Sequence, residues 1–251
     1  MKIDLSNKKV IITGGSTGIG KEVVKLFAEN DAKIAIFDVN NTEGIKLTNE
    51  LNQNGHDIRY WNVDVRDSNQ VSGGVLAAEQ WLEGVDILIN LAGVLQGASL
   101  EIEEFPDEIW DSVIGINLTG SFLMVKHISS IMKKQKNGVI ILTSSGAGVD
   151  GSSSSFAYGS SKGGVHGLSM VLMDKLSKYG IRVHDILPGS VDTPLKNSQI
   201  EKTRDITGNE AEYKNLKNIL VEPKGIAEII LFMCSDNAHL LKGSIRTQWK
   251  R

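Results

Sequence analysis

The sequence predicts an α/β fold: a doubly wound parallel β-sheet with helices on both faces, in a single domain spanning residues 1–251. Short, almost entirely apolar segments alternate with longer amphipathic ones, which is typical of a parallel sheet buried between helices. A glycine-rich turn follows the first apolar segment and opens a helix. No linker or repeat interrupts this alternation, and we interpret the four serines at 152–155 as a loop.

The elements follow from hydrophobic periodicity. Strands are expected at residues 9–13, 34–37, 58–63, 85–90, 139–142 and 181–187. The helices expected between and after them cover residues 19–30, 42–51, 68–81, 106–134 and 158–176. Pro106 is acceptable in the first turn of a helix. Residues 191–220 are polar and are assigned to no regular element; a last core helix, which includes the buried Cys234, follows them.

Composition narrows the classes of function. A net charge of −3 argues against nucleic acid or an acidic membrane surface as the main partner. The single cysteine excludes an internal disulfide and a cysteine-based metal site. The five histidines lack metal-ligand spacing, so no metal site is expected. Neither a signal-peptide h-region nor a run of about 20 apolar residues is present, and we therefore expect a cytoplasmic protein without a membrane span.

A first candidate site lies where the strand at 139–142 ends. That strand delivers Ser144 and Ser145 to its carboxyl edge, and Tyr158 and Lys162 open the helix that follows the next loop. Residues four apart share one helix face, so phenol and ammonium point the same way. A cation beside a phenol lowers the phenol pKa, and a pKa of about 7 would need roughly 4 kcal/mol of stabilisation. Such a phenol can be a base toward an alcohol or an acid toward a ketone. Because helices also carry this pair by chance, the pair alone does not predict a catalytic site, and other motifs of the chain must support it.

A second candidate site is the turn at residues 13–20, Thr-Gly-Gly-Ser-Thr-Gly-Ile-Gly. It lies between a buried strand and a helix, the context of a dinucleotide pyrophosphate site. Its spacing, G-x-x-x-G-x-G from Gly14, differs from the usual G-x-G-x-x-G. Asp38 ends the second strand and can hold the adenosine ribose hydroxyls, whereas it would repel a 2′-phosphate. Neither Ser16 nor Val39 offers a cation for that phosphate, so the predicted cofactor is NAD.

Together these segments resemble the short-chain dehydrogenase/reductase family, in its single-domain branch of the Rossmann fold, over essentially the full length. Further matching segments are Asp64-Val65, the Asn90-Leu91-Ala92-Gly93 sequence, Asn117, the gap of 13 residues between Ser145 and Tyr158, and Pro188-Gly189. The resemblance implies an NAD-dependent oxidoreductase acting on a secondary alcohol or ketone. The cofactor-binding residues it implies are Tyr158 and Lys162 together with Gly14, Ser16, Thr17, Gly18, Ile19, Asp38, Asp64, Val65, Asn90, Ala92, Gly93, Pro188, Gly189, Val191 and Thr193.

The catalytic roles are also those that the resemblance implies. Tyr158 would be the general acid/base, and Lys162 would lower its pKa and bind the nicotinamide ribose. Ser145 would hold the substrate oxygen near Tyr158, and Asn117 would support a water-linked proton path to Lys162. Hydride transfer itself is the chemistry of the cofactor.

The chain departs from the family pattern at two places. Leu91 replaces a second asparagine, which puts local hydrogen bonding in doubt, and the chain ends without the family's Asp-Gly-Gly. Residues 191–220 fall where the family places its substrate lid. Substrate alternatives remain a secondary alcohol, a sugar or polyol, and a 3-oxoacyl thioester; a sugar epimerase or dehydratase and a non-catalytic NAD-binding protein are further readings of the fold. The helices at 106–134 and 157–178 would pair between subunits, giving a homodimer or homotetramer.

Overall fold

The computed structural model describes residues 3–151 and 153–247. Its described part contains one sheet of seven parallel strands in the order β3-β2-β1-β4-β5-β6-β7. The strands are β1 Lys9–Thr13, β2 Lys33–Asp38, β3 Ile58–Asn62, β4 Ile87–Asn90, β5 Gly138–Thr143, β6 Ile181–Leu187 and β7 Gly243–Arg246. The order reverses between β1 and β4, and ligands of open parallel sheets bind at the carboxyl ends of the strands beside such a switch point.

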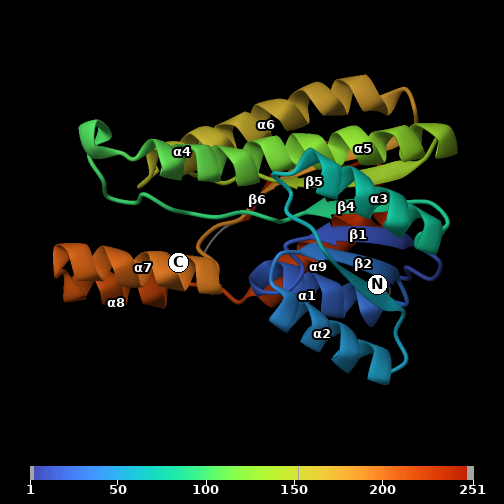
Figure 1. The fold of residues 1–251 in the computed structure, drawn as a ribbon, viewed down its shortest axis with the longest axis horizontal. Helices are drawn as coiled ribbons and strands as arrows, with labels where there is room; N and C mark the ends of the chain where they lie inside the picture. Colours follow the sequence, from blue (N-terminus) through green and yellow to red (C-terminus); the bar gives the residue numbers. More distant parts are fainter. Residues whose placement is uncertain (1–2, 152, 248–251) are drawn as a thin grey trace.

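Two helical layers cover the sheet (Figure 1). One contains α1 Gly18–Ala28, α2 Asn41–Gln53 and α9 Pro223–Cys234; the other contains α3 Ser68–Leu82, α4 Asp107–Ile114, α5 Gly120–Gln135 and α6 Phe156–Ser177. Alternate residues of each strand enter separate cores: Val10 and Ile12 pack in one and Ile11 in the other. Because both faces of the central strands β1, β2, β4 and β5 are buried, these strands are largely apolar, whereas β3, β6 and β7 carry more polar residues.

The predicted fold class is confirmed, and each predicted strand and helix is present within two residues of its expected bounds. The predicted helix at 106–134 differs in one respect. It contains a π-helical turn, Gly115–Thr119, between α4 and α5. Such turns insert an extra residue into a helix and are frequent at functional sites. This one contains Asn117, which is buried.

The polar stretch at 191–220, for which the sequence predicts no particular element, forms regular structure. It folds into α7 Pro194–Thr207 and α8 Glu210–Asn218, a pair that projects from the body of the molecule (Figure 1). A short parallel bridge between Val191 and Val221 closes its base. Side-chain caps explain how such a polar sequence becomes helical: Thr193 accepts from the N–H of Lys196, and Asn209 accepts from the N–H of Glu212.

The end of the chain adds the last strand. β7 pairs in parallel with β6, and Thr247 follows it with a hydroxyl that accepts a hydrogen bond from the N–H of Gly189 at 3.1 Å. Arg246 forms an ion pair with Asp150 in the loop after β5. The described part of the chain end therefore fastens two loops that border the site, and the last residues of its unusual sequence, 248–251, lie outside the described residues.

Candidate active site

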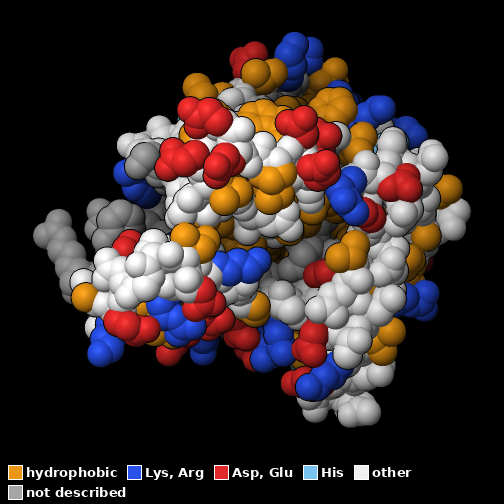
Figure 2. Space-filling view, turned by 60° about the vertical axis from the view of Figure 1, so that its left-hand side comes forward, with side chains coloured by type: hydrophobic (Ala, Val, Ile, Leu, Met, Phe, Trp, Pro, Cys, Tyr) orange, Lys and Arg blue, Asp and Glu red, His pale blue; other side chains and the backbone are white. Residues whose placement is uncertain are grey.

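One pocket runs along the carboxyl ends of the strands. Figure 2 shows a hollow between the α7–α8 pair and the body of the molecule, with hydrophobic side chains at its rim. Fourteen of the predicted site residues line the pocket: Gly14, Thr17, Gly18, Ile19, Asp38, Asp64, Val65, Ala92, Gly93, Ser145, Tyr158, Lys162, Pro188 and Thr193. Five others, Ser16, Asn90, Asn117, Gly189 and Val191, do not line it; four of these are buried and Gly189 is half-buried.

The glycine-rich turn needs its glycines. Gly14 has φ +66°, and a Cβ there would lie 2.8 Å from the backbone nitrogen of Ala92. Gly18 has φ +54°, and its Cβ would lie 3.1 Å from Cγ2 of Thr193 across the pocket. Both positive φ angles disfavour a side chain. The backbone of the turn is therefore bare toward the pocket at the N-terminus of α1, where N–H groups can hold phosphate oxygens.

Asp38 stands at the end of β2 beside this turn. One carboxylate oxygen accepts from the N–H of Ser16 and the other from the N–H of Asn40, both at 3.0 Å. These bonds fix the carboxylate at the pocket wall, while Val39 next to it is 61% exposed. The arrangement offers a negatively charged acceptor for hydroxyl groups.

Arg66 also lines the pocket, which the sequence reasoning missed. Its guanidinium grips the Asp64 carboxylate, with Nη2–Oδ2 at 2.6 Å and Nε–Oδ1 at 3.0 Å. This hydrogen-bonded pairing lowers the pKa of Asp64 and raises the pKa of Arg66. The Asp-x-Arg spacing could have predicted this pairing, because an arginine two residues after an aspartate can reach back to its carboxylate. The Arg66 cation is thus already paired.

Tyr158 and Lys162 meet Ser145 at the other end of the pocket. Lys162 is 6% exposed, lies 5.7 Å from the Tyr158 ring centre, and donates at 2.8 Å to the carbonyl oxygen of Thr143. Burial lowers the pKa of Lys162 to about 8, although the negative charge of Asp185 opposes this shift. The ammonium is thus held close to the pocket at a high desolvation cost.

The expected lowering of the Tyr158 pKa is not seen. Burial of the phenol raises its pKa above the ordinary value, and only a hydrogen bond with Ser145 works in the opposite direction. The reason is geometric, because Lys162 directs its ammonium at the Thr143 carbonyl rather than at the phenol. Tyr158 is therefore neutral at neutral pH in this state, which is the form that can donate a proton.

Asn117 holds the loop after Gly93 against α6. Its side chain accepts from the N–H of Val94 at 2.8 Å and donates to the Val94 carbonyl at 3.0 Å and to the Ser161 hydroxyl at 2.9 Å. Between Asn117 and Lys162 lies Gly93, where a Cβ would be 3.3 Å from Asn117 Oδ1 and 3.6 Å from Lys162 Nζ. The glycine leaves open the space between these two side chains.

The Leu91 substitution leaves the strand ends well connected. The Thr13 hydroxyl accepts from the N–H groups of Leu91 and Ala92, both at 3.1 Å, and donates to Asn90 Oδ1 at 3.0 Å. Asn90 in turn donates to the Ser121 hydroxyl at 2.8 Å. Leu91 packs against the core instead. Thr13 and Asn90 therefore tie β1, β4 and α5 together without a second asparagine.

The residues of the pocket fit a dinucleotide. The bare glycine turn suits a pyrophosphate, Asp38 suits ribose hydroxyls, and Thr143 lines the pocket with a buried hydroxyl that has no hydrogen-bond partner among the described residues. Within residues 3–151 and 153–247 no cluster of three or more His, Cys, Asp or Glu side chains could hold a metal ion. The same residues contain no helix with the length and apolar character of a membrane span.

Comparison with known proteins agrees with this geometry. The family model for short chain dehydrogenases matches residues 8–204. The chain is 33% identical over 243 residues to (+)-borneol dehydrogenase 1 of Salvia officinalis, covering 95% of this chain and 91% of the relative. It is 30% identical over 241 residues to a 3-oxoacyl-[acyl-carrier-protein] reductase of Thermotoga maritima, covering 96% of each.

Solved structures show the same relationship. The structure of an actinorhodin polyketide ketoreductase variant with NADPH superposes with a TM-score of 0.88 at 25% identity, covering 96% of each chain. Levodione reductase superposes with a TM-score of 0.89 at 27% identity, covering 97% of this chain and 96% of its own. The chain therefore belongs to the short-chain dehydrogenase family, the oxidoreductases that act on CH–OH or keto groups.

Proposed function

We propose that this protein is an NAD-dependent dehydrogenase/reductase of secondary alcohols and ketones, with Tyr158 as the general acid/base. The observation that carries the proposal is the convergence of Tyr158, Ser145 and Lys162 at one end of a pocket whose other end contains Asp38. The proposed proton carrier and the proposed ribose acceptor therefore line one and the same pocket.

Different residues of the pocket would bind different parts of the dinucleotide. The N–H groups of the 14–19 turn would hold the pyrophosphate, and Asp38 would accept the adenosine ribose hydroxyls. Lys162 would hold the nicotinamide ribose, and Pro188 and Thr193 would border the nicotinamide. The bound cofactor supplies hydride chemistry.

Tyr158 and Ser145 handle the substrate oxygen. Tyr158 gives its phenolic proton to a ketone oxygen in reduction, and as phenolate it takes the proton of an alcohol in oxidation. Ser145 holds the substrate oxygen and Tyr158 in one hydrogen-bonded group. Asn117 and Lys162, separated by the space that Gly93 leaves, would return protons from water to Tyr158.

The pocket lining favours an apolar substrate. Apolar side chains of the lining include those of Val94, Ile116 and Leu195, and Leu195 is exposed. Among the described residues that line the pocket, two carry a positive charge, Arg66 and Lys162. Each already donates a hydrogen bond to a group of the protein. A bulky aliphatic or cyclic alcohol such as borneol fits these features, and the similarity to a borneol dehydrogenase supports this choice.

A 3-oxoacyl thioester is the second candidate substrate, because one of the relatives reduces 3-oxoacyl groups on a carrier protein. Turnover of NAD(H) with a panel of cyclic and aliphatic alcohols, their ketones, polyols and a 3-oxoacyl thioester tests the proposal and separates the candidates. Selective turnover of the thioester would favour the second candidate, and no turnover of any member would contradict the proposed function.

NAD(H) should bind more tightly than NADP(H), because the Asp38 carboxylate repels a 2′-phosphate and Val39 offers no cation. Asp38→Ala combined with Val39→Arg should move the preference toward NADP(H) by about tenfold or more. Titration of both reduced cofactors by fluorescence measures the preference, with Val39→Arg alone as the control that retains the carboxylate. Equal or tighter binding of NADPH by the unaltered protein would contradict the assignment.

The protein should self-associate as a dimer or tetramer through α4, α5 and α6. Large apolar side chains on these helices face solvent in the single chain: Trp110 is 40%, Phe122 50%, Met170 59% and Val171 51% exposed. Phe122→Asp with Met170→Asp should shift the assembly toward monomer. Light scattering at micromolar concentration measures the mass, with Leu240→Asp as an exposed apolar control. A mass of about 27.3 kDa for the unaltered chain would refute the prediction.

A further inference from the structure

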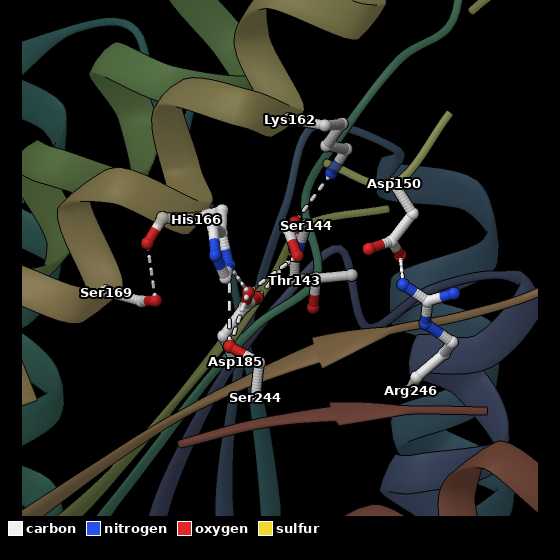
Figure 3. A network of polar contacts seen from close by, with 9 residues as sticks. All are labelled: Thr143, Ser144, Asp150, Lys162, His166, Ser169, Asp185, Ser244 and Arg246. Atoms are coloured by element: carbon white, nitrogen blue, oxygen red, sulfur yellow. Dashed lines mark hydrogen bonds and ion pairs between the residues drawn. The ribbon is translucent and has the colours of Figure 1, made fainter. Parts of the chain in front are cut away.

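A fully buried carboxylate lies directly behind the candidate active site. Asp185 is on β6, is 0% exposed, and faces α6 across the sheet end (Figure 3). It accepts from the N–H of Ser144 at 3.0 Å and from the Ser144 hydroxyl at 2.7 Å. Nδ1 of His166 lies 2.8 Å from the same carboxylate, and because a carboxylate only accepts, this nitrogen carries the proton. The Ser244 hydroxyl makes a longer contact of 3.4 Å.

The hydrogen bonds to Ser144 fix the two residues beside it. Ser144 is buried and has backbone and side chain both bound to one carboxylate. Its neighbour Thr143 uses its carbonyl to hold the Lys162 ammonium, and its other neighbour, Ser145, hydrogen-bonds Tyr158. A shift at Ser144 would therefore move the partners of Lys162 and Tyr158 together.

The charge of Asp185 also acts on Lys162. Burial favours the neutral amine of Lys162, and the negative charge of Asp185 opposes that shift. The titratable side chains around Lys162 are Tyr158 and His166 on its own helix and Asp185 on β6. β5 and the π-helical turn contribute the neutral Thr143 and Asn117, and β7 contributes the neutral Ser244 near Asp185.

We propose that Asp185 is a positioning residue of this site: through Ser144 it aligns the Thr143 carbonyl with Lys162 and the Ser145 hydroxyl with Tyr158. His166 supports it from α6 by holding the carboxylate in place. The proposal deepens the proposed function and rests on it for its effect on turnover.

Asp185→Asn tests the charge and Ser144→Ala tests the alignment. Asp185→Asn keeps the shape but removes the charge, so the pKa of Lys162 should fall by about one pH unit and the fall of the reduction rate at alkaline pH should begin correspondingly earlier. Ser144→Ala removes one bond to the carboxylate but leaves its charge, so kcat/KM should fall about tenfold with little change in that pKa. Ser244→Ala, which loses only two long contacts of 3.4 Å, one to Asp185 and one to Nδ1 of His166, is the matched control and should change neither quantity more than about twofold.

Two readouts are needed. The pKa of Lys162 is measured in the cofactor-free protein by NMR titration of lysine labelled with ¹³C at Cε, assigned with Lys162→Met. The pH profile of kcat/KM is measured on the best substrate of the panel. Circular dichroism shows whether Asp185→Asn folds. If it does not, the kcat/KM of Ser144→Ala tests the alignment, and the Lys162 pKa is measured instead in His166→Gln, which weakens the hydrogen bond to the Asp185 carboxylate.

The outcomes separate this proposal from the proposed function. An unchanged Lys162 pKa with kcat/KM of all variants within about twofold of the unaltered protein would overturn the role of Asp185, even if Tyr158→Phe is inactive. No turnover with any substrate would instead contradict the proposed function, and the NMR titration would still decide whether Asp185 sets the charge of Lys162.

Discussion

Tyr158→Phe should lower kcat for both oxidation and reduction by about a thousandfold or more, while NAD(H) binding stays within a few-fold of the unaltered value. The substitution removes the phenolic oxygen and keeps the ring that packs on α6. The hydroxyl of Ser145 remains beside the proposed position of the substrate oxygen. It is only as acidic as an ordinary alcohol, so it cannot replace Tyr158 as the proton carrier. Stopped-flow turnover and fluorescence titration measure the two quantities.

The pH dependence of the unaltered enzyme has a defined sign. Because burial raises the Tyr158 pKa, the phenol is protonated at neutral pH and is ready as the acid for reduction. Oxidation needs the phenolate, so its rate should rise toward alkaline pH while the reduction rate falls. Tyr179→Phe, which lies just beyond α6 and does not line the pocket, is the control and should leave both rates unchanged. Near-normal turnover by Tyr158→Phe would show that the acid/base lies elsewhere.

The sheet and the geometry of the glycine-rich turn were predictable because their signals are local. An apolar run identifies a buried strand, and a glycine turn followed by a helix predicts a phosphate-binding site without knowledge of distant residues. The backbone angles of Gly14 and Gly18 and the bonds of Asp38 agree with that interpretation.

The α7–α8 pair was missed because it buries little. α8 has no buried residue and α7 buries only Gln199 and Ile200, so neither shows a strong apolar face. Capping and ion pairs such as Lys217–Glu201 support them instead. A sequence pattern based on apolar spacing does not register helices of this kind.

The electrostatics were misjudged for a different reason. The spacing of Tyr158 and Lys162 correctly predicts a shared face, but the pKa of each depends on how deeply the fold buries it. Asp185 illustrates the same limit: it is one of three polar residues in β6, and only the pairing of β6 with β5 brings it to Ser144. The positions of the histidines in the sequence likewise do not predict that His166 contacts the carboxylate of Asp185.

Lys162→Met should have two opposite effects, a loss of function and a gain of stability. Removing the ammonium takes away the proposed ribose contact and the cation nearest to Tyr158, so cofactor binding should weaken about tenfold or more and kcat should fall about a hundredfold or more. These losses are measured by NADH titration and by the pH–rate profile.

The gain of stability follows from the depressed pKa of Lys162. The unfolded chain holds this proton up to about pH 10.5 and the folded chain only to about 8, so charging the buried amine destabilises the cofactor-free fold by on the order of 3 kcal/mol. The cost is complete below about pH 8 and disappears as the pH rises from about 8 to 10.5. Loss of the bond to the Thr143 carbonyl costs about 1 kcal/mol in the variant, leaving a net gain.

The melting temperature of cofactor-free Lys162→Met should therefore rise by several degrees at pH 7, and the difference should shrink by pH 10. Lys175→Met, at an exposed position near the end of α6, is the matched control and should melt like the unaltered protein at both values. A variant that binds NADH normally and melts no higher at pH 7 would mean that Lys162 is neither the ribose ligand nor a destabilising buried charge.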